Sequence, residues 1–420
     1  RNFPMILEKE ELINQLLNDY SKESTINLLK EMIKIPSHKN VEWQEDKQVK
    51  FIADYLAEHQ VDDISLEYIE ENRPNIIARI SGNKSGNNLL LNGHTDTIPP
   101  YNMVIPPYTP EIKDGYITGR GSVDMKGSLA AMLSAMVIIA ESNIDLSGDL
   151  IFAGVIDQEQ RSLGAVKLVE DKIDADYAII GEPTDLRICH AHKGMEWYKI
   201  VIKGLSAHGS TPEKGQNTIY HGARIAAEIE KLNFKLMARE NSFVSPPTIN
   251  VGVISGGDDP NIVPNITILE VDRRYTPDES RQSIYEEIER LLAKVNSTYP
   301  GFITEVITME DRVCPLKNMP LTGISKNKLT GSLQNSLRRF SDRDNSLTYF
   351  RGWSDAALFA NKLMIPSLVF GPGLPEKCHS GDESLKIEDL IAAAKENPGE
   401  IRATAAGAGS IHHLNFLALE

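Results

Sequence analysis

The sequence is poor in cysteine, in basic residues and in long apolar runs, and each shortage excludes a class of protein. Its three cysteines, Cys189, Cys314 and Cys378, are too scattered for a disulfide framework or a zinc knuckle. A reducing compartment, and hence the cytoplasm, is therefore expected. The 44 basic residues fall short of the 59 acidic ones, and the net charge of −15 argues against nucleic acid as a partner. No apolar run is long enough for a membrane span, and the N-terminus lacks the pattern of a signal peptide.

What is present predicts a globular protein of two domains, because 420 residues exceed the length of one ordinary domain. Short apolar runs at 75–80, 88–91, 150–156 and 177–180 predict strands buried on both faces. Apolar residues at helical spacing occur at 12–34 and 49–60, and a strongly apolar helix is expected from Gly127. Helices alternating with such strands predict an α/β fold, with a mostly parallel sheet flanked by helices.

A second domain is predicted inside the first. Between 194 and 310 the pattern changes to strand, helix, strand, strand, helix, strand, which is the βαββαβ order of a ferredoxin-like domain. A helix at 321–340 and a buried strand at 366–373 then resume the first domain. The predicted organisation is 1–193 and 311–396 for the first domain, 194–310 for the insertion, and an irregular tail at 397–420. His412 and His413 are interpreted as tail residues, although such a pair can bind metal.

Polar side chains gather where the predicted strands end, which is where α/β sheets bind ligands. They are His94, Asp96, Asp124, Asp157, Glu159, Glu182 and His379. A mixed set of histidines and carboxylates suits Zn²⁺ or Co²⁺. So many acids in one site would repel one another without cations. The set therefore predicts two divalent ions that share a bridging carboxylate.

His94 and Asp96 are two residues apart, so in an extended chain their side chains point the same way. Asp96 can then accept the second ring N–H of His94 and orient a metal-bound imidazole. Taken alone, this pair is more often a satisfied loop histidine, and Asp124 before a helix can be only an N-cap. The joint arrangement favours a metal site.

Several longer stretches carry a resemblance to a known family. They are GHTDTIPP, GRGSVDMKGSLAAML, DQEQRSLGA, IIGEPTD, SAHGSTPEKGQNTI and FGPGLPEKCHSGDE. Over about residues 10 to 395, they resemble the acetylornithine deacetylase / succinyl-diaminopimelate desuccinylase / aminoacylase / carboxypeptidase G family. The resemblance implies a zinc-peptidase-like amidohydrolase with two zinc ions, or cobalt or manganese, and an inserted lid domain through which a homodimer forms.

The resemblance also implies roles for individual residues. Asp124 would bridge the two metals, with His94 and Glu182 on one metal, and Glu159 and His379 on the other. His208, in the lid, would reach the active site of the partner subunit and stabilise the oxyanion. The alternative for His208 is an ordinary loop residue. Substrate contacts are expected from Arg274, as a carboxylate clamp or otherwise a surface charge, and from Asn261, Gly371 and Gly373.

One position departs from the family pattern. The family has Asp-Glu-Glu where this chain has Asp157, Gln158 and Glu159. The first glutamate of that pair is the general base, and a glutamine amide is not a usable base near neutral pH. Glu159 is expected on metal and Asp157 is expected to point away. Loss of a general base costs about 10²–10⁴ in rate, so residual activity is compatible with Gln158.

Several alternatives follow for function. Gln158 is either a deliberate change in a working deacylase of N-acyl amino acids or the natural residue of a homologue that binds an acyl amino acid or peptide without turnover. The intact metal set favours the first. A dipeptidase or carboxypeptidase of the same family and a purely structural protein are further alternatives. The acyl group, the amino acid and the metal are left open by the sequence.

Overall fold

The computed structural model describes residues 21–142, 144–241, 243–323, 327–340 and 344–392. Contacts divide the chain into two units: unit 2 comprises His192–Thr322 and Arg351–Trp353, and unit 1 comprises the rest. Among the helices of the described ranges, none has the length and apolar character that a membrane span needs. The tail expected at 397–420, with His412 and His413, lies outside the described residues.

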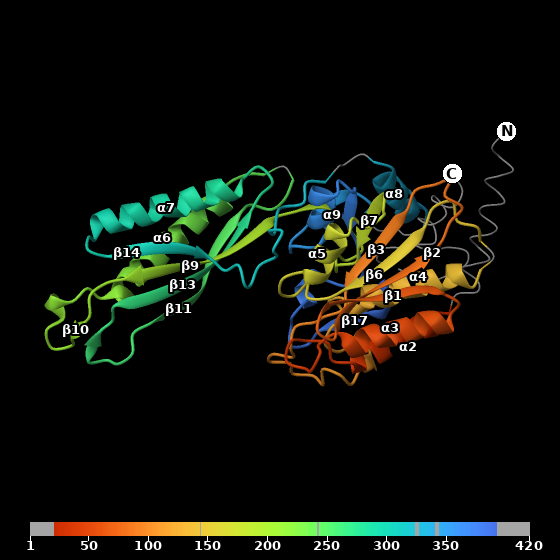
Figure 1. The fold of residues 1–420 in the computed structure, drawn as a ribbon, viewed down its shortest axis with the longest axis horizontal. Coiled ribbons are helices and arrows are strands. Elements are labelled where there is room, and N and C mark those ends of the chain that lie inside the picture. The colour runs from red at the N-terminus through yellow and green to blue at the C-terminus, as the bar shows by residue number, and fades with distance from the viewer. Residues whose placement is uncertain (1–20, 143, 242, 324–326, 341–343, 393–420) are drawn as a thin grey trace. The chain divides into compact units, whose positions relative to one another are not determined.

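Unit 1 is built on an eight-stranded sheet with the order β1-β2-β6-β3-β7-β16-β8-β15 (Figure 1). The pairs β6–β3, β3–β7 and β7–β16 are parallel, whereas β1–β2, β2–β6 and β16–β8 are antiparallel. The strands are β1 (Asp63–Glu70), β2 (Arg73–Ile80), β3 (Leu89–His94), β6 (Leu150–Val155), β7 (Tyr177–Ile180), β8 (Ile188–His192), β15 (Leu347–Phe350) and β16 (Ser367–Val369). A small sheet adds β4 (Ile112–Lys113), β5 (Tyr116–Thr118) and β17 (Ser384–Lys386).

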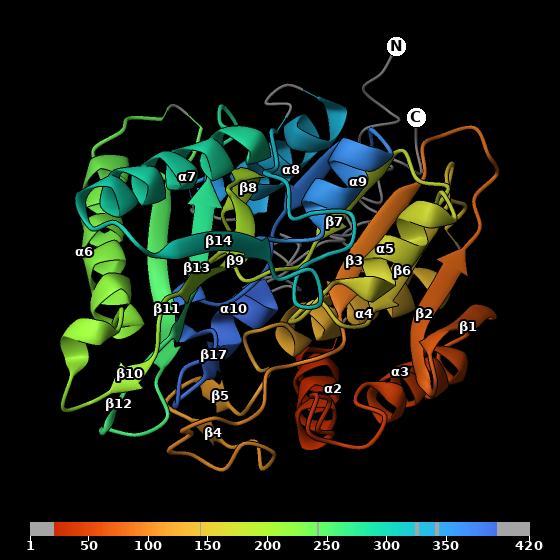
Figure 2. The ribbon, with the colours of Figure 1, turned by 60° about the vertical axis from the view of Figure 1, so that its left-hand side comes forward.

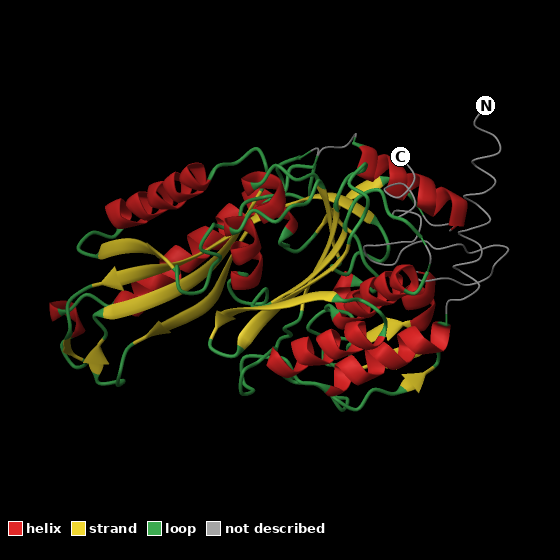
Figure 3. Cartoon of the chain, turned by 45° about the vertical axis from the view of Figure 1, so that its right-hand side comes forward, coloured by secondary structure: helices red, strands yellow, loops and turns green. Residues whose placement is uncertain are grey.

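Helices lie on both faces of this sheet (Figure 3). One side carries α2 (Lys22–Lys34), α3 (Asp46–Glu58), α4 (Lys126–Ala140) and α10 (Ile387–Ala392), and the other carries α5 (Leu163–Glu170) and α9 (Ala356–Lys362). Unit 1 also contains α8 (Lys328–Phe340) and the short helix η2 (Pro375–Lys377). Because α4 is apolar nearly all round, it is buried between the sheet and the outer helices.

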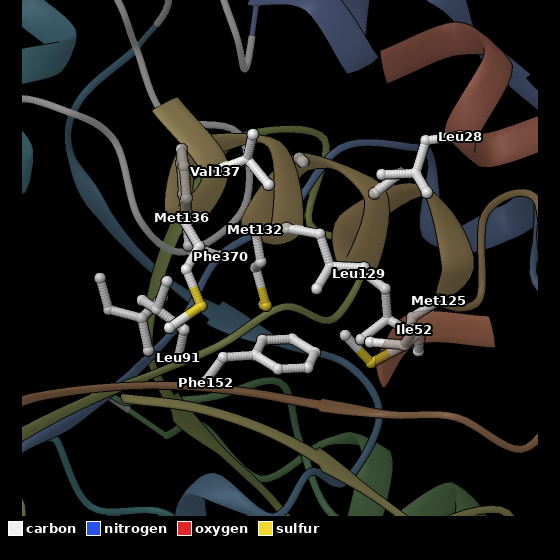
Figure 4. Packing of buried hydrophobic residues seen from close by; sticks show 14 of the residues in the cluster. Leu28, Ile52, Leu91, Met125, Leu129, Met132, Met136, Val137, Phe152 and Phe370 are labelled. Carbon is white, nitrogen blue, oxygen red and sulfur yellow. The ribbon is translucent and has the colours of Figure 1, made fainter. Parts of the chain in front are cut away.

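The core of unit 1 lies under α4. Leu129, Met132 and Met136 of this helix project toward Leu91 of β3 and Phe152 of β6 (Figure 4). All five side chains are fully buried. The central strands β3 and β6 are buried at every position, as strands covered on both faces should be. This packing fixes the ends of both strands, where the polar side chains follow.

Unit 2 is a four-stranded antiparallel sheet with the order β11-β13-β9-β14. Helices α6 and α7 cover one of its faces (Figure 2). Its main elements are β9 (Gly194–Lys203), α6 (Thr218–Met237), β11 (Thr248–Gly256), β13 (Ile266–Tyr275), α7 (Arg281–Thr298) and β14 (Ile303–Thr308). It also contains β10 (Ala207–His208), η1 (Pro212–Lys214) and β12 (Ile262–Val263). Asn217 and Ser280 cap the two long helices by accepting hydrogen bonds from backbone N–H groups.

The structure confirms the predicted fold class, and the βαββαβ order of the insertion is present. Two details differ from the predicted elements. The sheet carries antiparallel strands at both edges, and the helix expected at 321–340 begins only at Lys328. Of the helix expected at 12–34, the described part is Lys22–Lys34.

Candidate metal centre

The predicted ligands of unit 1 lie on five loops or strand ends of that unit. His94 is the last residue of β3, Asp124 lies two residues before α4, and Glu159 follows β6. Glu182 follows β7, and His379 follows η2 in the connection after β16. The N-cap alternative for Asp124 is not seen, because α4 has no side-chain cap. The carboxylate of Asp124 instead faces two histidines.

These side chains form a continuous cluster. Asp124 lies at its centre, with Oδ1 3.0 Å from Nε2 of His94 and Oδ2 3.3 Å from Nε2 of His379. Nε2 of His379 is also 2.9 Å from Oε1 of Glu159. Oε1 of Glu182 is 4.0 Å from Nε2 of His94. Asp124 thus points one oxygen toward His94 and the other toward His379. A carboxylate that bridges two metal ions must be arranged in this way.

Asp96 supports this cluster through the far ring nitrogen of His94. Nδ1 of His94 lies 2.9 Å from the backbone carbonyl oxygen of Asp96 and 3.4 Å from its Oδ1. Nδ1 therefore donates mainly to the main chain of Asp96, and Nε2 is left to face the cluster. The carboxylate of Asp96 accepts the backbone N–H groups of Gln158 and Glu159, at 3.1 and 3.0 Å. Asp96 thereby ties the end of β3 to the loop after β6.

The electrostatics of the cluster favour added positive charge. Burial raises the pKa of Glu159 and of Glu182, and the charge of Asp124 raises both further. Burial by itself lowers the pKa of each histidine, but carboxylate hydrogen bonds outweigh it. The pKa of His94 is consequently well above its usual value, and that of His379 is raised to about 11. Protons on the two histidines thus balance the negative charge of the carboxylates, and a bound metal cation would balance the same charge.

The residues present fit divalent metal. One ligand atom each of His94, Asp124 and Glu159 lie within 4.8 Å of one another. Oε1 of Glu182 is buried and accepts no hydrogen bond within the described part of the chain, which is costly for a carboxylate unless another partner is bound. Two imidazoles and three carboxylates are a donor set that Zn²⁺ or Co²⁺ accepts.

Asp157 points away from this cluster and into a buried ion pair. Its Oδ1 accepts a hydrogen bond from Nη2 of Arg73 at 2.9 Å. The same guanidinium donates through Nε and Nη2 to Glu45, at 2.8 and 2.7 Å. The backbone of Asp157 has a φ of 70°, and its carbonyl accepts the N–H groups of the three residues 160–162. Arg73 and Glu45 thus hold the base of the loop that carries Gln158.

Several of these supporting residues could not be identified from the sequence. Arg73 is the first residue of β2 and Glu45 directly precedes α3, and both stand in polar stretches of the sequence. Asp355 follows a short bend before α9, is fully buried, and hydrogen bonds with Ser162. Burial, with the charge of Asp96 adding to it, raises the pKa of Asp355 to about 7. Only the folded chain brings these groups together, because their partners are distant in sequence.

Unit 2 places His208 beside Asn261. Strands β10 and β12 pair His208 with Ile262, and the Gly209 N–H donates to the carbonyl of Asn261 at 2.6 Å. Nδ1 of the exposed His208 accepts the backbone N–H of Ser210 at 3.1 Å. A neutral His208 therefore carries its proton on Nε2, which leaves Nε2 as a hydrogen-bond donor.

Arg274 and Gly373 have different surroundings. Nε of Arg274 donates to both carboxylate oxygens of Asp272, at 2.9 and 3.1 Å, while the guanidinium remains partly exposed. Gly373, in unit 1, has a φ of +96°, and a Cβ there would lie 2.9 Å from Val123. A packing requirement therefore accounts for this glycine. That Arg274, Asn261 and Gly373 contact substrate stays a prediction.

Comparison with known proteins identifies the family to which the chain belongs. Residues 90–396 match Peptidase family M20/M25/M40, and the chain belongs to that family. It is accordingly a hydrolase that acts on amide bonds. The acetylornithine deacetylase of Proteus mirabilis is 30% identical over 390 residues, 90% of this chain and 95% of the relative.

Two further comparisons extend this result. The succinyl-diaminopimelate desuccinylase of Marinobacter nauticus is 28% identical over 324 residues, 73% of this chain and 81% of the relative. A crystal structure of a dinuclear metal-binding M20 peptidase from Bacillus subtilis matches with a TM-score of 0.65 at 15% identity. That match covers 95% of this chain and 97% of the other, and it supports the fold alone.

Proposed function

We propose that this chain has the architecture of a dimetal amidohydrolase for N-acyl amino acids, with its general base replaced by Gln158. His94 and Glu182 would hold one divalent ion, Glu159 and His379 would hold the other, and Asp124 would be shared between them. The observation that carries this proposal is the placement of the two Asp124 oxygens, one toward each histidine. The names of the relatives suggest acetylated or succinylated amino acids as substrates.

Residue 158 is the proposed base position. When bound, the two cations would acidify a water molecule and polarise the scissile carbonyl. A glutamate at 158 would take a proton from the attacking water and pass it to the leaving amine. Glutamine keeps the shape but cannot accept that proton. Asp157 does not replace it, because its carboxylate is bound to Arg73.

His208 is the proposed oxyanion donor, acting from a partner subunit. The bond from the Ser210 N–H to Nδ1 supports this role, because it puts the proton of a neutral imidazole on Nε2. Such a group could donate to a developing negative charge without itself being charged. Arg274, with a partly exposed guanidinium, remains the proposed clamp for the substrate carboxylate.

Assembly and location belong to the same proposal. A homodimer through unit 2 is supported by exposed apolar side chains on α6 and on the edge strand β11, namely Tyr220, Phe234, Met237 and Ile254. A cytoplasmic location is proposed from the small number of cysteines. Zinc is the proposed metal, with cobalt and manganese as alternatives.

The test compares this chain with Gln158→Glu, each loaded with Zn²⁺ or Co²⁺. The substrates are a panel of N-acetyl and N-succinyl amino acids and dipeptides. We expect Gln158→Glu to raise kcat by about 10²–10⁴ on at least one of them. Gln158→Asp is the matched control. It restores a carboxylate that is one methylene shorter, so we expect a much smaller gain.

Each other outcome has a definite meaning. If both chains bind two metals and neither hydrolyses any substrate, a homologue that binds acyl amino acids or peptides without turnover becomes the better proposal. If neither chain binds a stoichiometric divalent ion, the acid cluster has no catalytic role and the proposal is wrong. Turnover of the dipeptides alone would favour a dipeptidase over a deacylase.

A further inference from the structure

A buried carboxylate, Glu383, lies between two of the ligand-bearing loops of unit 1. Its Oε2 accepts hydrogen bonds from Nη1 of Arg120, at 2.6 Å, and from the backbone N–H of Gly121, at 3.0 Å. Its Oε1 accepts the backbone N–H groups of Val123 and Asp124, at 2.9 and 3.1 Å. The side chain is fully buried, so no water competes for these four donors.

Glu383 connects the loop of Asp124 to the loop of His379. It stands four residues after His379 and directly before β17. Its backbone carbonyl also accepts the N–H of Gly119, and β17 continues the connection by pairing with β5. Among the described residues, Glu383 is the one whose side chain accepts the backbone N–H of Asp124. That hydrogen bond joins the two loops.

The four contacts require a carboxylate. All four neighbours are N–H donors, and a carboxylate offers acceptor positions on both oxygens. A glutamine would turn its NH₂ group toward two of the donors, which would leave both without an acceptor. Aspartate would keep the charge, but it is one methylene too short to span the same positions. The buried carboxylate of Glu383 thus holds the segment 120–124 in place.

We propose that Glu383 is a positioning residue that sets the bridging carboxylate of Asp124 against the imidazole of His379. The inference rests on the proposed function, because it assumes that both residues bind metal. Its physical basis is direct. The bond to Asp124 N–H fixes the main chain from which that side chain extends, and the loop of Glu383 carries the histidine. Partners of metal ligands in such positions typically change metal affinity about 10–100-fold when they are replaced.

The test measures Co²⁺ binding to the parent chain, to Glu383→Gln and to Asp382→Asn. Asp382 is the matched control because it is the preceding residue, lies at the surface and pairs with Lys377 at 2.6 Å. Cobalt absorption gives the number and affinity of the ions, and electron paramagnetic resonance gives the coupling between them. Thermal unfolding of the metal-free proteins reports folding separately.

We expect Asp382→Asn to match the parent within twofold. Glu383→Gln should bind at least one Co²⁺ about 10–100-fold more weakly and lose the magnetic coupling that a shared carboxylate provides. A role in folding alone would lower the melting temperature and leave affinity and coupling unchanged, and that result would overturn the inference.

A second variant covers the case in which Glu383→Gln does not fold. Glu383→Asp keeps the buried charge, and we expect it to fold and to show weakened binding of Co²⁺. Parent-like binding and coupling in Glu383→Asp would equally overturn the inference. A parent chain that binds no pair of ions would refute the proposed function, and the inference with it. Normal binding by the parent and by every variant would refute the inference alone.

Discussion

Replacement of Arg73 by methionine tests whether the loop of Gln158 depends on a buried ion network. Arg73 lies at the start of β2, and its side chain is 9% exposed. It donates three hydrogen bonds to Glu45 and Asp157, whose side chains are 0% and 4% exposed. Methionine is similar in length, so the variant removes the charge and the donors while filling most of the space.

The expected cost follows from what is left behind. Two buried carboxylates lose their common partner, and removing one member of a buried ion pair costs about 3–5 kcal/mol. The fourth contact of Arg73, with Glu70, adds little because that acid is 45% exposed. We therefore expect the free energy of unfolding to fall by about 3–5 kcal/mol at neutral pH.

The loss should depend on pH, with a sign that follows from the folded-state pKa values. Burial raises the pKa of Glu45 to about 7 and that of Asp157 to about 6, although Arg73 opposes both shifts. An acid whose folded pKa exceeds its unfolded pKa adds stability at low pH and loses it as pH rises through the folded value. Without Arg73 both values rise further. The variant should therefore be impaired less at pH 5 than at pH 8.

Urea denaturation at pH 5 and pH 8 measures both effects. Lys34→Met is the control, because Lys34 is in the same unit and both members of its ion pair with Glu31 have side chains that are 52% exposed. We expect the control to cost about 1 kcal/mol or less. Equal losses for the two variants, or a larger loss for Arg73→Met at pH 5 than at pH 8, would refute the reasoning.

Three further predictions concern the core and the metal. Phe152→Ala, at a fully buried site, should lower the free energy of unfolding by about 3–5 kcal/mol, whereas Val104→Ala, at an 81% exposed site, should change it by about 0.5 kcal/mol at most; similar urea midpoints would contradict this. Zn²⁺ at 100 times its dissociation constant should stabilise the chelator-treated protein by about 2.7 kcal/mol for each site that it fills. Because His94 and His379 hold protons without metal, calorimetry in buffers of different ionisation enthalpy should show proton release on binding; no dependence on the buffer would contradict it.

The sequence predicted the elements with strong periodicity and missed those without it. The strand 177–180 and the helix from Gly127 were found because their apolar patterns are unbroken. The edge strand β1, DISLEYIE, was missed because its burial alternates and half of its residues face solvent. Strands β8 and β15 were missed for a related reason, since ICHAH and LTYF are short and partly polar.

The same division applies to the site. His94 and Glu182 could be located because each stands at or just after a strand that is visible in the sequence. Arg73 could not, because its value depends on contacts 28 and 84 residues away along the chain. A local pattern records which element a residue belongs to. It does not record which distant loop that element will contact. Those long-range contacts determine which residues support the site.

The loop after β6 shows why the exchange at position 158 can be interpreted chemically. Asp96 holds this loop through the backbone N–H groups of Gln158 and Glu159, which glutamate and glutamine possess equally. Arg73 holds it through Asp157, which the exchange does not alter. The main chain at position 158 is therefore expected to stay in place in Gln158→Glu. A change in rate would then report the proton acceptor itself, and an unchanged rate with both metals bound would count against that role.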